Sequence, residues 1–137
     1  GSWGNRHPNL IVENRPIYNE DYVKAISASS INLCFLRKAN RDLQTCRSIE
    51  IPSCSGFMLH ERNSEITNLY REAKEAVYFS SDEELFDMCS FWLNRDQRSF
   101  IIGEAAKKRT IELGLSHKIN IIRVINNALS NYSDLVL

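Results

Sequence analysis

Short, continuously apolar runs alternate with helix-like stretches along the first 80 residues, and this alternation limits the fold more than any other feature of the sequence. Four runs are bounded by polar or turn-forming residues: LIVE (10–13), INLCFL (31–36), GFML (56–59) and AVYF (76–79). Runs of this length are typical of parallel strands that are buried on both faces. The sequence therefore predicts an α/β fold in which helices flank a parallel sheet. Four short strands are few for such a sheet, so we expect its first strand to be absent from this chain.

Two of the helices have recognisable starting signals. Asn19 can cap a helix whose first turn carries Glu20 and Asp21, which suit the positive end of the helix dipole. Ser81 and Glu84 have the spacing of a capping box ahead of a second helix, which runs through SSDEELFDMCSFWLN. The first of these helices joins the first two predicted strands.

The last third of the chain is predicted to be helical. One helix should run over 96–113, with Gly114 as its left-handed stop, and another over 118–130. Apolar spacing predicts their buried residues: Phe100, Ile101 and Ala105 in the former, and Ile121, Ile122, Ile125 and Leu129 in the latter.

Length and charge exclude several classes of protein. The 137 residues suit one domain, 1–137, and 43% of them are hydrophobic, as in ordinary globular proteins. Seventeen basic residues balance seventeen acidic ones, which argues against a nucleic-acid partner. No run approaches the roughly 20 apolar residues of a transmembrane helix. We expect a cytoplasmic protein without a transmembrane segment.

Four cysteines, Cys34, Cys46, Cys54 and Cys89, have no metal-binding pattern. No two of them have the two-residue spacing of a zinc site, and no pair of histidines complements them. We therefore expect reduced, structural thiols and no metal ligands.

A basic loop follows the second predicted strand. In open α/β sheets, ligands bind outside the carboxyl ends of the strands, so this loop occupies the place expected for a site. A helix start at Thr45 to Ser48 would favour an anion such as a pyrophosphate. Composition alone fits a solvated basic loop equally well. The cations of this region are Arg37, Lys38, Arg41 and Arg47.

Glu50 lies shortly after this helix start. Its carboxylate could accept hydrogen bonds from two hydroxyls of a ribose, although a surface glutamate is the commoner reading. Pro52 requires that the helix either start near Ser48 or be kinked, because proline clashes with the carbonyl four residues earlier. Gly56 would let the backbone approach whatever Glu50 holds.

At these residues the sequence resembles a known family. The segments RKANRDLQTCRSIEIPSCSGFMLHER and EAVYFSSDEELFDMCSFWLNRDQRSFIIGEAAKKR are similar to the nucleotide-sugar-binding half of GT-B glycosyltransferases, in the group 1 branch related to the spore maturation protein CgeB. The resemblance covers nearly the whole chain. Its most specific parts are Thr45-x-Arg47-x-x-Glu50-x-Pro52, the strand Gly56 to Leu59, the segment ending at Phe79, and Glu83-Glu84-Leu85.

The resemblance implies a fold and a set of site residues. The fold is a Rossmann-like sheet, the C-terminal half of a GT-B enzyme whose N-terminal acceptor domain is absent here. Glu50 takes the place of the glutamate that binds the donor ribose. Asp42, where the family has a glutamate that contacts the sugar, and Arg47, beside the diphosphate, form the implied catalytic pair. The other implied donor-binding residues are Lys38, Asn40 and Thr45, Ser55 and Gly56 at the next turn, and Ile17 and Tyr18 near the base.

Three functions follow from these observations. The first is the donor-binding domain of a glycosyltransferase, which transfers a sugar from a nucleotide-sugar to an unknown acceptor without an essential metal or other cofactor. The second is a non-catalytic α/β interaction module, which is favoured by two departures from the family: Asp42, and Ser55 where relatives carry glycine. A receiver-like signalling domain ranks last, because the acidic cluster expected after the early strands is missing.

Overall fold

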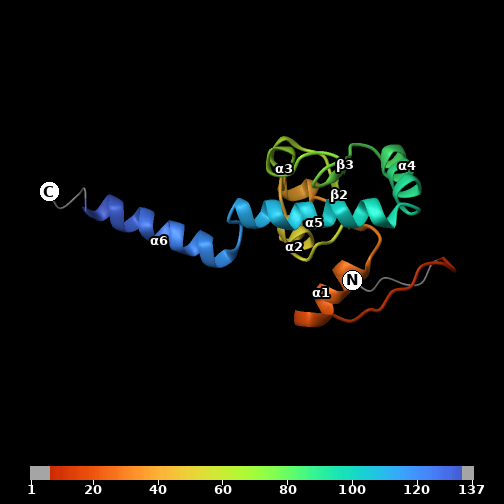
Figure 1. Cartoon of the computed structure of the whole chain (residues 1–137), viewed down its shortest axis with the longest axis horizontal. Coiled ribbons are helices and arrows are strands. Elements are labelled where there is room, and N and C mark those ends of the chain that lie inside the picture. Colours follow the sequence, from red (N-terminus) through yellow and green to blue (C-terminus); the bar gives the residue numbers. More distant parts are fainter. Residues whose placement is uncertain (1–6, 134–137) are drawn as a thin grey trace.

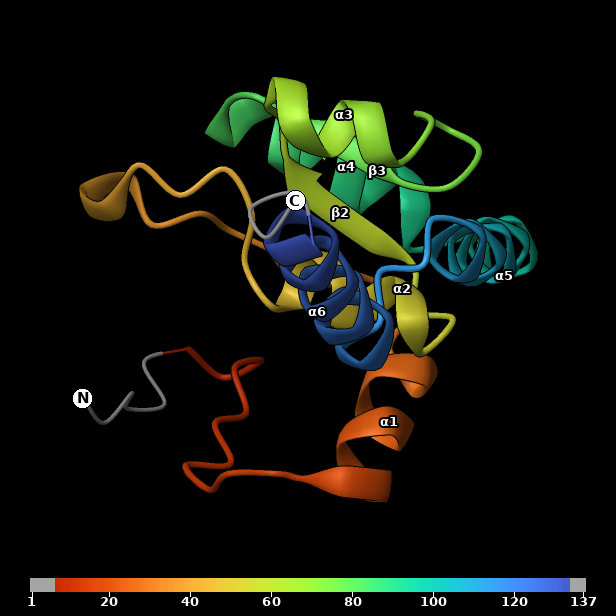
Figure 2. The same cartoon turned by 90° about the vertical axis from the view of Figure 1, so that its left-hand side faces the viewer.

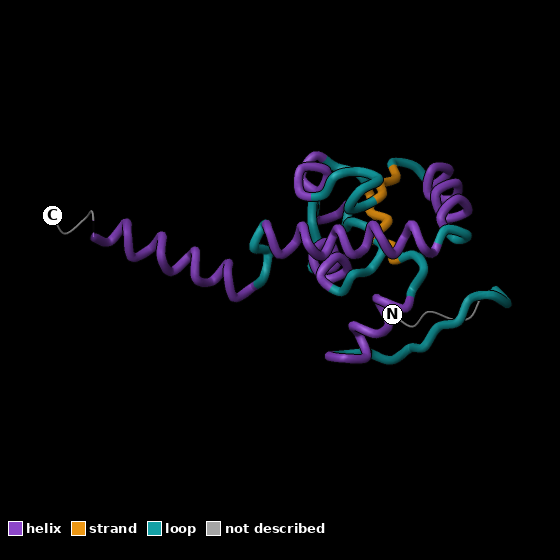
Figure 3. Tube along the Cα trace, in the orientation of Figure 1, coloured by secondary structure: helices purple, strands orange, loops and turns teal. Residues whose placement is uncertain are grey.

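A three-stranded parallel sheet forms the centre of the molecule in a computed structural model, which describes residues 7–133 (Figure 1). The strands are β1 (Asn32–Cys34), β2 (Met58–Glu61) and β3 (Val77–Phe79), and they lie side by side in the order β1-β2-β3. Leu59 of β2 pairs with Leu33 on one side and Val77 on the other. Figure 3 shows the strands in orange, enclosed by helices and loops.

Helices connect the strands and continue to the end of the described chain. They are α1 (Asn19–Ala28), a 3-10 turn η1 (Lys38–Asn40), α2 (Arg47–Ser53), α3 (Ser64–Leu69), α4 (Asp82–Trp92), α5 (Asp96–Glu112) and α6 (His117–Ser133). Each crossover between parallel strands thus contains a helix, α2 or α3, as parallel pairing requires. The fold is therefore α/β, with a parallel sheet flanked by helices, as predicted.

Hydrophobic clusters cover both faces of the sheet. One cluster contains Cys34, Ile51, Met58, Ile66, Tyr70, Ala76 and Tyr78. The other contains Phe57, Leu59, Val77, Phe79, Trp92 and Ile102. Because β2 and β3 contribute to both clusters, they are buried on both faces, which explains their continuously apolar sequences.

Three of the four predicted strands are confirmed, within shifts of one or two residues at their ends. The fourth, at 10–13, is wrong: this segment has no strand structure, and Leu10 and Ile11 are 42% and 82% exposed. Three apolar residues bury little surface and make no ladder by themselves, so they become a strand only where a sheet edge accepts them.

The predicted residues at two helix ends are confirmed, and the predicted cap at a third helix end is wrong. Ser81 Oγ accepts the Glu84 amide at 3.1 Å at the start of α4, and Gly114 has the expected left-handed φ of 63°. Asn19 does not cap α1; it is the first helical residue, and Tyr18 precedes it without a side-chain cap. Its φ of 51° is unusual for a helical residue.

The predicted buried face of α5 is wrong. Phe100 and Ile101 are 64% and 60% exposed. Ala105 is half-buried. The buried residues are instead Ser99, Ile102, Gly103, Ala106 and Thr110. These mostly small side chains let α5 lie close against the end of α2, a place where large side chains would not fit.

The predicted buried stripe of α6 is also wrong in this chain. Ile121, Ile122, Ile125 and Leu129 are 47–61% exposed. The reason is positional: after the stop at Gly114, α6 extends away from the sheet and its covering helices (Figures 1 and 2). No helix within residues 7–133 is both long enough and apolar enough to cross a membrane.

Candidate functional site

A cavity of about 500 Å³ lies at the carboxyl end of β1. The loop that follows β1 and the first turn of α2 form most of its wall, and α1 contributes one side chain. The residues that line it are Tyr22, Phe35, Arg37, Asn40, Asp42, Thr45, Cys46, Arg47 and Glu50. This is the edge of the sheet where parallel α/β folds bind ligands.

Five of the predicted site residues meet in this cavity: Asn40, Asp42, Thr45, Arg47 and Glu50. They come together because η1 and a left-handed residue at Arg41, with φ of 54°, fold the loop back toward α2. Asp42 and Glu50 therefore line one cavity although they are eight residues apart in the sequence.

The other five predicted residues do not line this cavity. Lys38 lies in η1, in the same loop, with an exposed side chain. Ile17 and Tyr18 precede α1. Ser55 and Gly56 lie ahead of β2, at the opposite end of the sheet, where a side chain on Gly56 would meet Ile26, Asn32 and Ile51.

Tyr22 donates a hydrogen bond from its hydroxyl to Glu50 Oε2 at 2.8 Å. Burial, and then the bond to Glu50, raise the pKa of Tyr22 to about 12. The hydroxyl therefore stays protonated and remains a donor across the physiological range. One carboxylate oxygen of Glu50 is thus held by the protein, and the other is left to accept from a ligand.

Two arginines in the cavity are not neutralised by the protein. Within residues 7–133, Arg37 and Arg47 make no ion pair. Asp42, in the same wall, makes none with the described residues either. Guanidinium groups bind phosphate oxygens through paired N–H donors, so the cavity offers two unpaired cations and two carboxylates to one ligand.

The first turn of α2 offers few free backbone donors. The amides of Ser48, Ile49 and Glu50 bond to the carbonyls of Thr45 and Cys46, and the Thr45 amide donates to Ser48 Oγ at 3.0 Å. α2 is also only seven residues long and ends one residue after Pro52. The expectation that helix-start amides hold an anion is therefore weakened, and most of the positive charge comes from the arginine side chains.

A buried histidine, His60, is hydrogen-bonded to the first turn of α2. His60 Nδ1 lies 2.6 Å from the Glu61 carbonyl and donates to it, so Nε2 accepts from Ser48 Oγ at 2.8 Å. Ser48 Oγ in turn accepts the Thr45 amide. His60 is fully buried, and this burial lowers its pKa below the ordinary value. The neutral ring thus fixes the position of the residues that begin α2.

Stability should therefore fall in mildly acidic solution. A lowered pKa in the folded state means that the unfolded chain binds the proton more readily below about pH 6.5, so the free energy of unfolding decreases as the pH falls. We expect a loss of at most about 1.4 kcal/mol per pH unit from this group, measured by urea denaturation. His117→Gln, at an exposed histidine, should keep this slope. An NMR titration that shows His60 charging above pH 6.5 would contradict the prediction.

A second cavity, of about 410 Å³, adjoins the first and shares Tyr22, Cys46 and Glu50 with it. Its other lining residues come from the start of α1, from α2 and from the α5–α6 connection: Asn19, Ile49, Ser53, Cys54, Leu115, Ser116 and His117. The hydrogen bond between Tyr22 and Glu50 joins two residues that both cavities share. A ligand bound to Glu50 can therefore extend into either one.

Sequence reasoning missed Tyr22, Phe35 and Cys46 as lining residues. Tyr22 lies on α1, and nothing in the sequence links it to a glutamate 28 residues later. Phe35 was included in a predicted strand, whereas β1 ends at Cys34. Its position just beyond a buried strand was a usable signal, because that is where α/β sites are built.

The cysteines are free thiols, and only Cys34 is fully buried. Its Sγ lies 3.7 Å from Thr45 Oγ1, and burial raises its pKa. Among the described residues, no three His, Cys, Asp or Glu side chains form a group that could hold a metal ion.

A parallel α/β sheet with a charged cavity beyond the carboxyl end of a strand defines a Rossmann-like half-domain with a candidate ligand site. The model of the glycosyl transferase-like family matches residues 1–119, and the chain belongs to that family. No curated protein and no solved structure matches the chain.

Proposed function

We propose that this chain is the nucleotide-sugar-binding domain of a GT-B glycosyltransferase of the CgeB-like branch. The observation that carries the proposal is the grouping of Arg37, Arg47 and the Tyr22-held Glu50 around one cavity. A nucleoside diphosphate has two anionic phosphates next to a ribose with two hydroxyls. The cavity offers cations for the first and a carboxylate oxygen for the second.

The parts of the donor fit the two adjoining cavities. Arg37 and Arg47, with Asn40 and Thr45, would bind the diphosphate, and Glu50 the ribose hydroxyls. Asp42 would contact the sugar. The second cavity, lined by Ile49 and Leu115 among others, would receive the planar base on the far side of Glu50. Lys38, in the neighbouring η1, would add positive charge at the entrance.

The chemical contribution of this half is electrostatic. When the sugar leaves, negative charge builds up on the departing diphosphate, and fixed guanidinium groups stabilise that charge more than they stabilise the bound donor. Transfer also requires an acceptor held in line with the sugar. We propose that a further N-terminal domain holds the acceptor, and that the enzyme acts in the cytoplasm. The present chain should bind donor weakly and transfer nothing alone.

Isothermal titration with UDP, GDP, ADP and CDP tests the proposal. We expect one of them to bind this chain without added metal, and Arg47→Gln to weaken that binding about tenfold, because a guanidinium–phosphate pair is lost. Arg41→Gln is the matched control, since Arg41 belongs to the same loop and does not line the cavity. Absence of binding to all four nucleotides would overturn the proposal in favour of a non-catalytic interaction module.

A further inference from the structure

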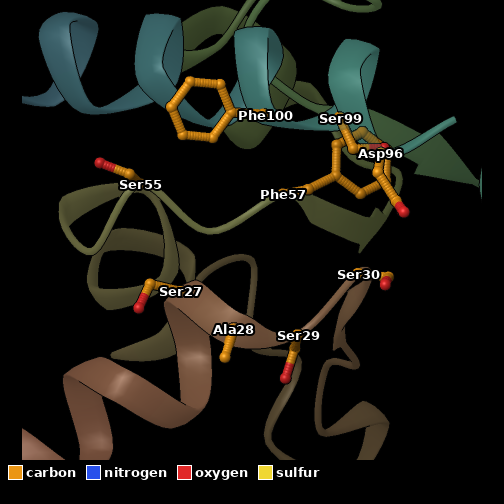
Figure 4. A pocket seen from close by; sticks show the side chains of 9 residues that line it. All are labelled: Ser27, Ala28, Ser29, Ser30, Ser55, Phe57, Asp96, Ser99 and Phe100. Carbon is orange, nitrogen blue, oxygen red and sulfur yellow. The ribbon is translucent and has the colours of Figure 1, made fainter.

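A separate cavity of about 280 Å³ lies at the amino end of the sheet, and its function is not explained by the donor site (Figure 4). The end of α1, the residues before β1 and β2, and the first turn of α5 form its wall. The lining residues are Ser27, Ala28, Ser29, Ser30, Ser55, Phe57, Asp96, Ser99 and Phe100. Five serines and one aspartate therefore contribute to the wall of a single small space.

Ser99 is the most informative of these residues. It is 4% exposed, and its Oγ makes no hydrogen bond with the described residues. A buried hydroxyl without a partner costs about 1–3 kcal/mol, and such groups are rare in folded proteins. Because Ser99 lines the cavity, a molecule that occupies the cavity can supply the missing hydrogen bond.

Other polar groups in the cavity are also without protein partners. Asp96 begins α5, and Figure 4 shows its carboxylate directed away from that helix toward the segment that carries Ser30. Within residues 7–133, the side chains of Asp96, Ser30 and Ser55 make no hydrogen bond or ion pair. The two serine hydroxyls can both donate and accept, and the carboxylate only accepts.

Two further serines use their hydroxyls within the protein. Ser29 Oγ donates to the Ala25 carbonyl at 2.7 Å, and Ser27 Oγ donates to the Lys24 carbonyl at 3.3 Å. Figure 4 shows both hydroxyls directed away from the α5 side of the cavity, so these two serines contribute wall surface only. The Asp96 carboxylate accepts, and the hydroxyls of Ser30, Ser55 and Ser99 both donate and accept, so a ligand that carries several O–H groups fits best.

The chemistry of the wall excludes other classes of ligand. An anion would meet the carboxylate of Asp96 and no basic lining residue. A metal ion would find one carboxylate, and the described residues contain no suitable group of ligands. Phe57 forms a buried part of the wall, and Phe100 is 64% exposed beside it, which provides an apolar surface for C–H groups. The volume is slightly below the 300–1,000 Å³ usual for small-molecule sites.

We propose that this cavity is a second binding site, which takes a neutral polyhydroxyl ligand about the size of one sugar ring. The unpartnered groups of Asp96, Ser99 and Ser30 would bond to ligand hydroxyls, and Phe57 and Phe100 would cover one face of the ring. The site lies at the end of β1 opposite the donor cavity and shares no residue with it. It would therefore hold a carbohydrate without competing with the nucleotide.

Two-dimensional amide NMR titrations with methyl glucoside, methyl galactoside, methyl mannoside and inositol test this proposal. We expect at least one of them to shift the amides of residues 27–30, 55–57 and 96–100 with millimolar affinity. Ser99→Ala and Asp96→Asn should each weaken that binding at least fivefold. Ser90→Ala, at an exposed serine of α4, is the matched control.

Two results would overturn the proposal. One is the absence of shifts in these residues with every probe. The other is unchanged binding in both variants together with a higher melting temperature for Ser99→Ala, which is the result expected if the Ser99 hydroxyl is only a buried group without a partner. Shifts confined to residues 37–50 are a case of the first result and would locate the sugar at the donor cavity. Nucleotide titrations report on the donor cavity independently.

Discussion

Replacing Gly103 with alanine is expected to lower the free energy of unfolding by about 2 kcal/mol. A Cβ at this position would overlap the carbonyl oxygen of Ser55 and lie 3.0 Å from its carbonyl carbon. Both are backbone atoms, so no side-chain rotation relieves the overlap and α5 must move away from α2. Overpacking of this kind costs about 3 kcal/mol at the upper end, and the better helix propensity of alanine offsets about 1 kcal/mol.

Thermal denaturation should show this effect as a fall of about 6 °C in the melting temperature. Gly114→Ala provides the comparison. There the new Cβ would meet the end of the flexible Arg123 side chain, so only the left-handed φ of 63° is costly, at about 1 kcal/mol. If Gly103→Ala were as stable as the original chain, or more stable, the close approach of α5 would have no energetic importance.

Glu50→Gln should weaken nucleoside diphosphate binding about tenfold, or about 1.4 kcal/mol. The carboxylate accepts hydrogen bonds with both oxygens. The amide has one oxygen and an N–H₂ group, which would face a ribose hydroxyl without the charge-assisted bond. The amide oxygen can still accept the Tyr22 hydroxyl, so the link between α1 and α2 is kept. Glu20→Gln, an exposed glutamate of α1, is the control, and isothermal titration is the measurement.

Tyr22→Phe tests how much the positioning of Glu50, as distinct from its charge, contributes to nucleotide binding. It leaves Glu50 charged but removes the donor that fixes one of its oxygens. We expect Tyr22→Phe to weaken nucleotide binding by about two- to threefold. The double variant, which also carries Glu50→Gln, should bind as weakly as Glu50→Gln alone. An unchanged dissociation constant in Glu50→Gln would remove Glu50 from the proposed ribose contact.

Parts of this fold could be predicted from the sequence because their causes are local. The runs at β2 and β3 are apolar since both faces of these strands are buried, whereas β1 is an edge strand on which Leu33 is 41% exposed. Ser81 and Gly114 act on helix ends within a few residues of themselves. Strand and cap signals of this kind depend little on where the rest of the chain lies.

Most of the wrong predictions depended on partners that are distant in the sequence; the Asn19 cap, a local signal, is the exception. Phe100 and Ile101 are large apolar residues early in α5, but the helix buries Ile102 and several small residues instead, because Gly103 lies directly against the Ser55 backbone. The stripe of α6 was expected to be buried because its spacing suits a core, yet no described element packs over it. The run at 10–13 has no strand to pair with among the described residues.

The candidate site shows the same division. Asn40, Asp42, Thr45, Arg47 and Glu50 lie within eleven residues, so one loop and one short helix bring them together and their grouping could be predicted. Tyr22 enters through α1, and the amino-end cavity combines the ends of three separate segments. Neither arrangement leaves a pattern in the sequence.

The strand order β1-β2-β3 also has a consequence for how the chain folds. Each parallel pairing joins strands that are consecutive in the sequence, so only one short helical crossover must be closed for each. The entropy lost in closing such loops grows only slowly with their length. Because β2 takes part in both pairings, either β1 or β3 can pair with it first. Events that delay β2 would delay the whole sheet.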